Sequence, residues 1–130
     1  MLEDIDKNLG VLIVDDQALT RDMVKSIIRQ LGFANLYLAE NGTRAMEILD
    51  TNKIDLIICD WNMPRMKGIE VLRAIKNNPK YKKVKFVMLT AEAYRESVKE
   101  AMNLKVDGYI AKPFTAKQLE ESLVKVLRDN

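Results

Sequence analysis

The stretch Val11-Leu12-Ile13-Val14-Asp15-Asp16 joins four consecutive apolar residues to an acidic pair. A short continuous apolar run of this kind predicts a strand that is buried on both faces, as in a parallel sheet. Polar residues that follow such a strand lie at the carboxyl edge of the sheet, where open α/β folds bind their ligands. The stretch therefore indicates both a class of fold and the edge that carries a site.

Further apolar runs of the same kind follow along the chain, and three of them also end in a polar residue. These runs are Leu56 to Cys59 before Asp60, Val84 to Leu89 before Thr90, and Gly108 to Ala111 before Lys112. Leu36 to Ala39 is the remaining predicted strand. Helical segments lie between the runs, and right-handed crossovers are nearly obligatory, so the pattern predicts a doubly wound α/β fold with five parallel strands and five helices. We find no linker, and we expect residues 1–130 to form a single domain.

Apolar residues three and four positions apart predict the inward faces of the helices. Gly32 is expected to end the first helix, Asn41 to cap the second, and Thr115 with Gln118 to form a capping box before the last. The expected inward residues are Met23, Val24, Ile27, Ile28 and Leu31; Ala45, Met46, Ile48 and Leu49; Ile69, Val71, Leu72 and Ile75; Val98, Ala101 and Met102; and Leu119, Leu123, Val124 and Leu127.

Composition excludes several kinds of chemistry. The chain has 130 residues, 48% of them hydrophobic, which suits one compact domain, and it contains no histidine. Ser-His-Asp and Cys-His catalysis are therefore excluded, and the single cysteine, Cys59, cannot complete a zinc site or an internal disulfide. Any metal must be bound by oxygen ligands, which favours a hard cation such as magnesium.

Charge and hydropathy give expectations about location and partners. No apolar run reaches the length of a membrane span and the amino terminus is acidic, so we expect a cytoplasmic protein without membrane contacts. The formal net charge is only +2. The lysines between Lys76 and Lys85 are therefore interpreted as a solvated connection around Pro79, and no nucleic-acid partner is expected.

The five polar residues at the strand ends predict a divalent-cation and phosphoryl site. Adjacent carboxylates at Asp15 and Asp16 require a cation or donors between them, and Asp60 adds a third carboxylate at the same edge. A hydroxyl at Thr90 and an ammonium at Lys112 suit the oxygens of a phosphoryl group. Three of the five also have an ordinary explanation: Asp16 as a helix cap, Thr90 as a strand-end threonine and Lys112 as a solvated lysine.

Four blocks in this order resemble the receiver domains of two-component response regulators, and within them the stand-alone chemotaxis regulators of the CheY type. The blocks are Val11 to Asp16, Asp60-Trp61-Asn62-Met63-Pro64, Leu89-Thr90-Ala91-Glu92-Ala93, and Gly108 to Phe114. The resemblance extends over essentially the whole chain. It implies a flavodoxin-like sheet of strand order 2-1-3-4-5.

The resemblance also implies a mechanism for the acidic cluster. Asp60 would accept a phosphoryl group from a histidine of a partner kinase of the chemotaxis type. Asp15, Asp16, Asp60 and the backbone carbonyl of Asn62 correspond to the ligands of Mg²⁺ in the family, with Asp16 and Asp60 in direct contact and Asp15 acting through water. The histidine that takes part in the transfer, which this chain lacks, then belongs to the partner kinase.

The same resemblance assigns the remaining residues of the edge. Thr90 and Lys112 would hold the phosphoryl oxygens, and Tyr109 matches an aromatic switch residue that turns inward when Thr90 moves toward phosphate. Asn62 and Glu92 match two variable positions that tune self-dephosphorylation. The chain would be a signalling phosphoacceptor with self-phosphorylation and self-dephosphorylation chemistry at Asp60, and not an enzyme acting on external substrates.

The output surface follows from the resemblance as well. It would be formed by the fourth helix, fifth strand and fifth helix, and would bind the flagellar motor switch. Its residues are Ala93, Tyr94, Arg95, Val98, Met102, Val106, Tyr109, Ala111, Ser122 and Lys125. Tyr94 and Ser122 stand where motor-binding members commonly carry lysine, and Ala111 replaces a larger aliphatic residue. Outside this surface, Gln17 stands where relatives often have an aromatic residue, a change expected to alter kinase docking or access to the site.

These departures leave other outputs open. The chain is a phosphorylation-dependent partner-binding module, a phosphate sink or regulator of a non-motor partner, or, less favoured, a Mg²⁺-dependent phosphohydrolase. Against the hydrolase, Asn62 stands where a second acidic residue would be needed. A phosphatase is a further candidate partner, a monomer is expected, and a DNA-binding effector is disfavoured because the sequence ends at Asn130, just after the last helix.

Overall fold

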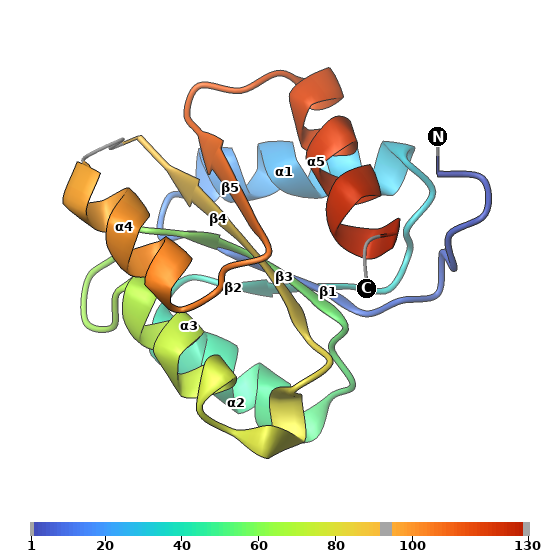
Figure 1. Ribbon diagram of the computed structural model, residues 1–130. Helices are drawn as coiled ribbons and strands as arrows, with labels where there is room; N and C mark the ends of the chain where they lie inside the picture. Colours follow the sequence, from blue (N-terminus) through green and yellow to red (C-terminus); the bar gives the residue numbers. More distant parts are fainter. Residues whose placement is uncertain (1, 92–94, 129–130) are drawn as a thin grey trace.

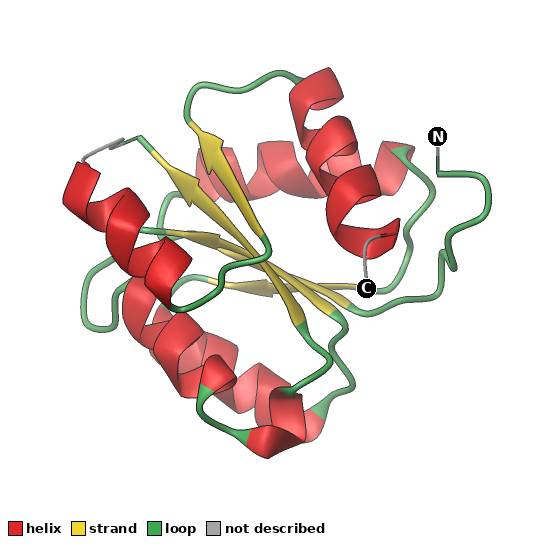
Figure 2. Ribbon diagram, in the orientation of Figure 1, coloured by secondary structure: helices red, strands yellow, loops and turns green. Residues whose placement is uncertain are grey.

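The computed structural model describes residues 2–91 and 95–128, which form one five-stranded parallel sheet with helices on both faces (Figures 1 and 2). The strands lie in the order β2-β1-β3-β4-β5, which confirms the predicted topology. The elements are β1 (Val11–Val14), α1 (Ala18–Gln30), β2 (Leu36–Ala39), α2 (Gly42–Thr51), β3 (Leu56–Asp60), α3 (Gly68–Lys76), η1 (Pro79–Tyr81), β4 (Lys85–Thr90), α4 (Arg95–Asn103), β5 (Gly108–Ala111) and α5 (Ala116–Arg128).

Alternation along the strands divides the core into two layers. In β1, Leu12 and Val14 pack in the layer that contains residues of α2 and α3, whereas Val11 and Ile13 pack in the layer that contains residues of α1 and α5. Figure 1 shows the same division, with α1 and α5 on one side of the sheet and α2, α3 and α4 on the other. Successive side chains of a strand point to opposite faces, so a strand between two helical layers must be apolar at every position.

The predicted helix ends are confirmed where a side chain was expected to cap them. Asn41 Oδ1 accepts a hydrogen bond of 2.8 Å from the backbone N–H of Arg44. Thr115 and Gln118 form a reciprocal capping box, with hydrogen bonds of 2.8 and 3.1 Å between each backbone N–H and the other side chain. Gly32 follows α1 with φ of +107°, a conformation that favours glycine.

Two residues predicted to face inward are exposed instead. Met23 is 45% exposed and Met102 is 60% exposed, whereas their neighbours Val24 and Ala101 are completely buried. Consecutive residues of a helix are about 100° apart, so a residue beside the buried position lies at the margin of the apolar stripe. The stripe on α1 and α4 is therefore narrower than the sequence pattern predicted.

Two further features concern the connections and the helices. Residues Pro79–Tyr81 form a 3₁₀ turn before β4 that the sequence reading treated only as a connection. In the described residues, every helix is too short or too polar to cross a bilayer.

Candidate functional site

Three carboxylates meet at the carboxyl edge of the sheet. Asp15 follows β1, Asp16 follows it, and Asp60 is the last residue of β3; one oxygen from each lies within 4.8 Å of the others. Asp15 is 1% exposed and Asp60 is 6% exposed, whereas Asp16 is exposed. The parallel register pairs Val14 with Cys59, so that the next residue of each strand is an aspartate. Strand pairing alone therefore brings the two buried carboxylates together.

Backbone and side-chain contacts hold Asp15 in place. Its Oδ1 accepts a hydrogen bond of 2.9 Å from the backbone N–H of Gln17, and its carbonyl oxygen accepts one of 2.8 Å from Nη1 of Arg21. Gln17 is the N-cap residue of α1, and its side chain makes no capping hydrogen bond. Asp16 therefore does not cap α1, which removes the ordinary explanation for this residue. The sequence reading missed Arg21, whose only signal was its position in the first turns of the helix.

Lys112 bridges the two buried carboxylates. Its Nζ lies 3.0 Å from Asp15 Oδ2 and 3.1 Å from Asp60 Oδ1, and its side chain is 19% exposed. Although burial alone lowers the pKa of Lys112, the hydrogen bond to Asp15 and the charge of Asp60 raise it above the ordinary value. The structure thus excludes the solvated lysine that the sequence left open. Lys112 follows β5, and its bond to Pro113 is cis.

The carboxyl group of Asp60 is held in an unfavourable environment for its charge. Burial raises the pKa of Asp60 above its ordinary value, and the charges of Asp15 and Asp16 act in the same direction, while Lys112 opposes them. Three carboxylates against one ammonium leave the cluster with uncompensated negative charge. Such a cluster favours the approach of a cation.

Thr90 connects this cluster to β5. It is the last residue of β4, is 1% exposed, and its carbonyl oxygen accepts a hydrogen bond of 2.7 Å from the backbone N–H of Lys112. Partial burial raises the pKa of Tyr109, and a side-chain hydrogen bond with Thr90 opposes that rise. The half-buried Tyr109 side chain therefore contacts the side chain of Thr90.

The loop after β3 is held close to the sheet. The backbone N–H of Trp61 donates a hydrogen bond of 2.8 Å to Leu89 O, and Gly68 N–H donates one of 3.0 Å to Trp61 O. A Cβ atom on Gly68 would lie 2.2 Å from the carbonyl oxygen of Asp60, so only glycine fits at the start of α3. Met63 is buried and Asn62 is exposed. These contacts fix the loop after β3 to β4 and to the start of α3.

The donors in the cluster fit a hard divalent cation. They are carboxylate oxygens, and the described residues of the cluster offer no sulfur or imidazole ligand. Mg²⁺ binds through a few carboxylates and keeps several water molecules, and exposed Asp16 leaves room for them. Asp15, Asp16 and Asp60 could thus hold the ion, and the part assigned to the Asn62 carbonyl stays a prediction.

Part of the predicted output surface lies outside the described residues. Ala93 and Tyr94 of this surface belong to the undescribed segment, as does Glu92, which was predicted to tune self-dephosphorylation, and only the backbone of Arg95 is described. Met102, Val106, Tyr109, Ser122 and Lys125 line one hollow of about 410 Å³ between α4, β5 and α5. Val98 is half-buried on α4 and Ala111 is exposed at the end of β5. The structure thus brings five of these residues together around one depression.

Comparisons with known proteins agree with this architecture. The model of the family described as "Response regulator receiver domain" matches residues 11–124. "Chemotaxis protein CheY-3" of Vibrio cholerae is 43% identical over 94% of both chains, and "Chemotaxis protein CheY" of Pseudomonas aeruginosa is 42% identical over 91% of this chain and 95% of that protein. The solved structure of the chemotaxis response regulator CheY4 of Vibrio cholerae superposes with a TM-score of 0.84 at 32% identity, covering 92% of this chain and 99% of that chain.

Proposed function

Because the chain belongs to the response regulator receiver family and is of the chemotaxis CheY type, we propose that residues 1–130 are a single cytoplasmic receiver domain whose Asp60 accepts a phosphoryl group from a histidine kinase. The observation that carries this proposal is the position of Asp60. Its carboxylate lies beside two others and is hydrogen-bonded to Lys112 at 3.1 Å. Receiver domains of this type are signalling proteins.

The transfer exchanges one phosphorus bond for another. A carboxylate oxygen of Asp60 attacks phosphorus of the phosphohistidine, an O–P bond forms, the N–P bond breaks, and the imidazole leaves and takes a proton from solvent. Bound Mg²⁺ supplies positive charge that reduces repulsion between the carboxylate and the phosphoryl dianion. In a separate dephosphorylation step, water attacks phosphorus in line, the O–P bond to Asp60 breaks, inorganic phosphate is released and the carboxylate is regenerated.

Lys112 and Thr90 are proposed to hold the phosphoryl oxygens. In the structure, the Lys112 ammonium compensates the charges of Asp15 and Asp60. Asp15, Asp16 and Asp60 would hold Mg²⁺, whose charge would compensate them, and the Lys112 ammonium would then be able to hydrogen-bond to a phosphoryl oxygen. Charge-assisted hydrogen bonds of this kind are about twice as strong as neutral ones.

The proposed signal passes through Thr90 and Tyr109. The hydrogen bond between these side chains competes with any hydrogen bond from Thr90 to a phosphoryl oxygen. Phosphorylation would therefore change the position of Tyr109, which lines the hollow between α4, β5 and α5. A bias of about 2 to 3 kcal/mol is enough to shift two populations by tens to hundreds of fold.

An apolar patch beside the site supports a protein as the phosphodonor. Leu19 is 85% exposed and Met23 is 45% exposed on the side of α1 that approaches the edge. Met23, Lys112, Pro113 and Phe114 together line a hollow of about 330 Å³. Exposed apolar residues that are clustered in this way favour a protein–protein contact, and here the contact would bring a histidine toward Asp60.

The proposed output is binding of a partner, with the flagellar motor switch as the first candidate. A specific observation favours a second candidate, a phosphate sink or a regulator of another protein. Ser122 and Ala111, small residues where motor-binding members carry larger ones, lie on the proposed surface, and Ser122 lines its hollow. Pull-down with motor-switch peptide, with and without beryllofluoride, distinguishes the two candidates: binding that requires beryllofluoride supports the motor, and binding in neither state supports the second candidate.

The proposed chemistry is tested by incubation with Mg²⁺ and acetyl phosphate. The protein should gain an acid-stable, base-labile phosphoryl group, and Asp60→Asn should not gain it. Half-buried Trp61 adjoins Asp60, so its fluorescence should change with Mg²⁺ or beryllofluoride. Normal labelling of Asp60→Asn would overturn the assignment, and multiple turnover of small phosphate esters that is lost in Asp60→Ala would favour a hydrolase instead.

A further inference from the structure

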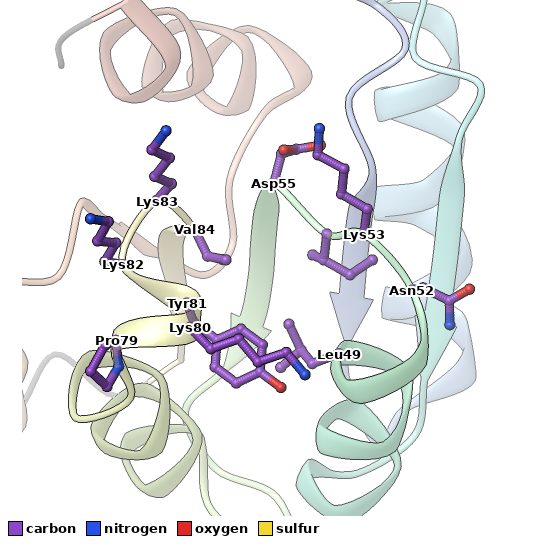
Figure 3. Close-up of a pocket in the computed structure, with 11 residues that line it drawn as sticks. Leu49, Asn52, Lys53, Asp55, Pro79, Lys80, Tyr81, Lys82, Lys83 and Val84 are labelled. Atoms are coloured by element: carbon purple, nitrogen blue, oxygen red, sulfur yellow. The ribbon is translucent and has the colours of Figure 1, made fainter.

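A hollow of about 390 Å³ lies at the end of the sheet opposite to Asp60 (Figure 3). It is formed by the end of α2, the segment that enters β3, and the connection from η1 to β4. Asp60 and Thr90 are the last residues of β3 and β4, whereas this hollow lies before their first residues. A ligand bound here would therefore leave the carboxylate edge accessible.

The floor of the hollow is apolar and well packed. Leu49, Ile54, Tyr81 and Val84 line it, and all four are buried members of the core layer beneath α2 and α3. Leu49 belongs to α2 and Tyr81 to the 3₁₀ turn, so the floor is built by elements that are rigidly attached to the sheet. A preformed apolar depression of this size suits one aliphatic or aromatic side chain of a ligand.

The rim carries positive charge that the described part of the chain does not compensate. Lys53, Lys82 and Lys83 line the hollow, and their side chains have no hydrogen bond or ion pair with the residues described. Lys80 also lines the hollow and pairs with Asp50 at 3.4 Å, but both side chains are largely exposed, so this pair is weak. Asp55 is the one acidic residue of the lining, and its carboxylate accepts a hydrogen bond from Gly10 N–H.

The lysines stand on two sides of the apolar floor. Figure 3 shows Lys82 and Lys83 on one side and Lys53 on the other, with Tyr81 and Leu49 lower in the hollow. A partner peptide that lies across the hollow with one apolar side chain over the floor would therefore have lysines on both sides of that side chain. The sequence predicts that the lysines between Lys76 and Lys85 form a solvated connection. The structure adds a depression between this connection and Lys53.

From this arrangement we infer that the hollow docks an acidic segment of a partner protein, with carboxylates against Lys53, Lys82 and Lys83 and one apolar side chain over the floor. Charge complementarity selects an anionic partner. Nucleic acid fits less well, because bases stack on free aromatic faces, whereas Tyr81 is nearly buried and the Lys80 ammonium lies 5.5 Å from its ring centroid. The inference is independent of the chemistry proposed for Asp60.

The test is an amide chemical-shift titration of the full chain at low salt with defined probes. The first probe is an acetylated peptide with a central leucine flanked on each side by two glutamates; the second has glutamine in place of each glutamate. We expect the acidic peptide to shift the amides of residues 52–55 and 80–84, the neutral peptide to bind at least about tenfold more weakly, and the affinity to fall with added salt.

Two double variants with the same change of net charge provide the control. Lys82→Glu with Lys83→Glu should weaken binding of the acidic peptide at least about tenfold. Lys25→Glu with Arg29→Glu alters α1 and should leave the shifts of residues 80–84 unchanged. All of these side chains lie at the surface, and amide shifts like those of the wild type away from the substituted residues verify each fold.

Several results would overturn the inference. They are equal binding of the neutral peptide, equal loss of binding in both double variants, and absence of shifts in residues 52–55 and 80–84 at millimolar peptide. Tighter binding of a short DNA duplex than of the acidic peptide, lost in Lys82→Glu with Lys83→Glu, would assign the hollow to nucleic acid instead.

Discussion

The Nζ atom of Lys112 donates a hydrogen bond of 3.1 Å to Oδ1 of Asp60, across a separation of 52 residues in the sequence. The same ammonium lies 3.0 Å from Asp15 Oδ2, so one cation serves two buried carboxylates. Asp16 adds a third negative charge within 4.8 Å. The buried carboxylate of Asp60 is therefore only partly compensated by Lys112.

Substitution Asp60→Asn should stabilise the metal-free protein at neutral pH by about 1 kcal/mol. The change removes a buried charge: burial is the main cause of the raised pKa of Asp60, and Lys112 offsets it only in part. Burial of an incompletely compensated polar group costs on the order of 1 to 3 kcal/mol. In saturating Mg²⁺ the order should reverse, because the wild type binds the ion more tightly and ligand binding stabilises the folded state. Urea denaturation with and without Mg²⁺ measures both effects.

The pH dependence gives a second readout of the same substitution. Burial raises the pKa of Asp60 in the folded state, so the folded protein holds this proton more tightly than the unfolded chain. Its contribution to the free energy of unfolding is therefore fully present below the unfolded pKa and is lost as the pH rises through the folded pKa. The free energy of unfolding of Asp60→Asn, relative to that of the wild type, should therefore increase as the pH rises from the unfolded to the folded pKa of Asp60. A difference that is constant with pH would contradict an unfavourable burial of the Asp60 charge.

Thr90→Val should leave occupation of the Asp60 site intact but abolish the response of Tyr109 to it. Valine keeps the branched shape but cannot hydrogen-bond to Tyr109 or to a phosphoryl oxygen. We expect beryllofluoride to shift the Tyr109 ring resonances in the wild type, and to change Trp61 fluorescence but not these resonances in the variant. Thr90→Ser, which retains the hydroxyl, is the matched control. A wild-type shift of Tyr109 in Thr90→Val would show that the signal takes another route.

Leu19→Ala with Met23→Ala should slow phosphotransfer from the kinase about tenfold or more without affecting acetyl phosphate. The two side chains are 85% and 45% exposed, so their removal costs little folding energy but deletes apolar contact area of a docking surface. Rapid-quench transfer from phosphorylated kinase measures the effect, with acetyl phosphate as the internal control. Equal slowing with both donors would indicate a distorted site rather than a lost docking surface.

Gly68→Ala should destabilise the fold by about 1 to 3 kcal/mol and weaken Mg²⁺ binding. The new Cβ would meet the backbone oxygen of Asp60 at 2.2 Å, and this strand carbonyl cannot move without displacing the carboxylate of the same residue. Gly108→Ala is the control, because its nearest neighbours are side-chain atoms of Val126, Val87 and Ser122 at 3.0 to 3.3 Å. Urea denaturation and Mg²⁺ titration followed by Trp61 fluorescence measure stability and metal binding in both variants. Equal losses in the two variants would contradict the explanation.

The sequence predicted most of the fold because each strand is a continuous apolar run bounded by polar residues. Val11–Val14 and Gly108–Ala111 begin and end where the pattern placed them, and the order of all five strands is as expected. The predictions for Met23 and Met102 were wrong because periodicity locates an apolar face but not the width that neighbouring elements cover. The 3₁₀ turn at Pro79–Tyr81 was missed because a single turn has no periodicity to detect.

The candidate site shows the same limit. The sequence alone determined which side chains stand at the carboxyl ends of the strands, because an apolar run followed by Asp60, Thr90 or Lys112 is a local property. Only the tertiary structure decided that Lys112 binds Asp15 and Asp60 rather than solvent, that Arg21 supports Asp15, and that Lys53 faces Lys82 and Lys83 across a hollow. The physical reason is that these relationships depend on strand register and on the packing of helices from distant parts of the chain, which no local pattern records.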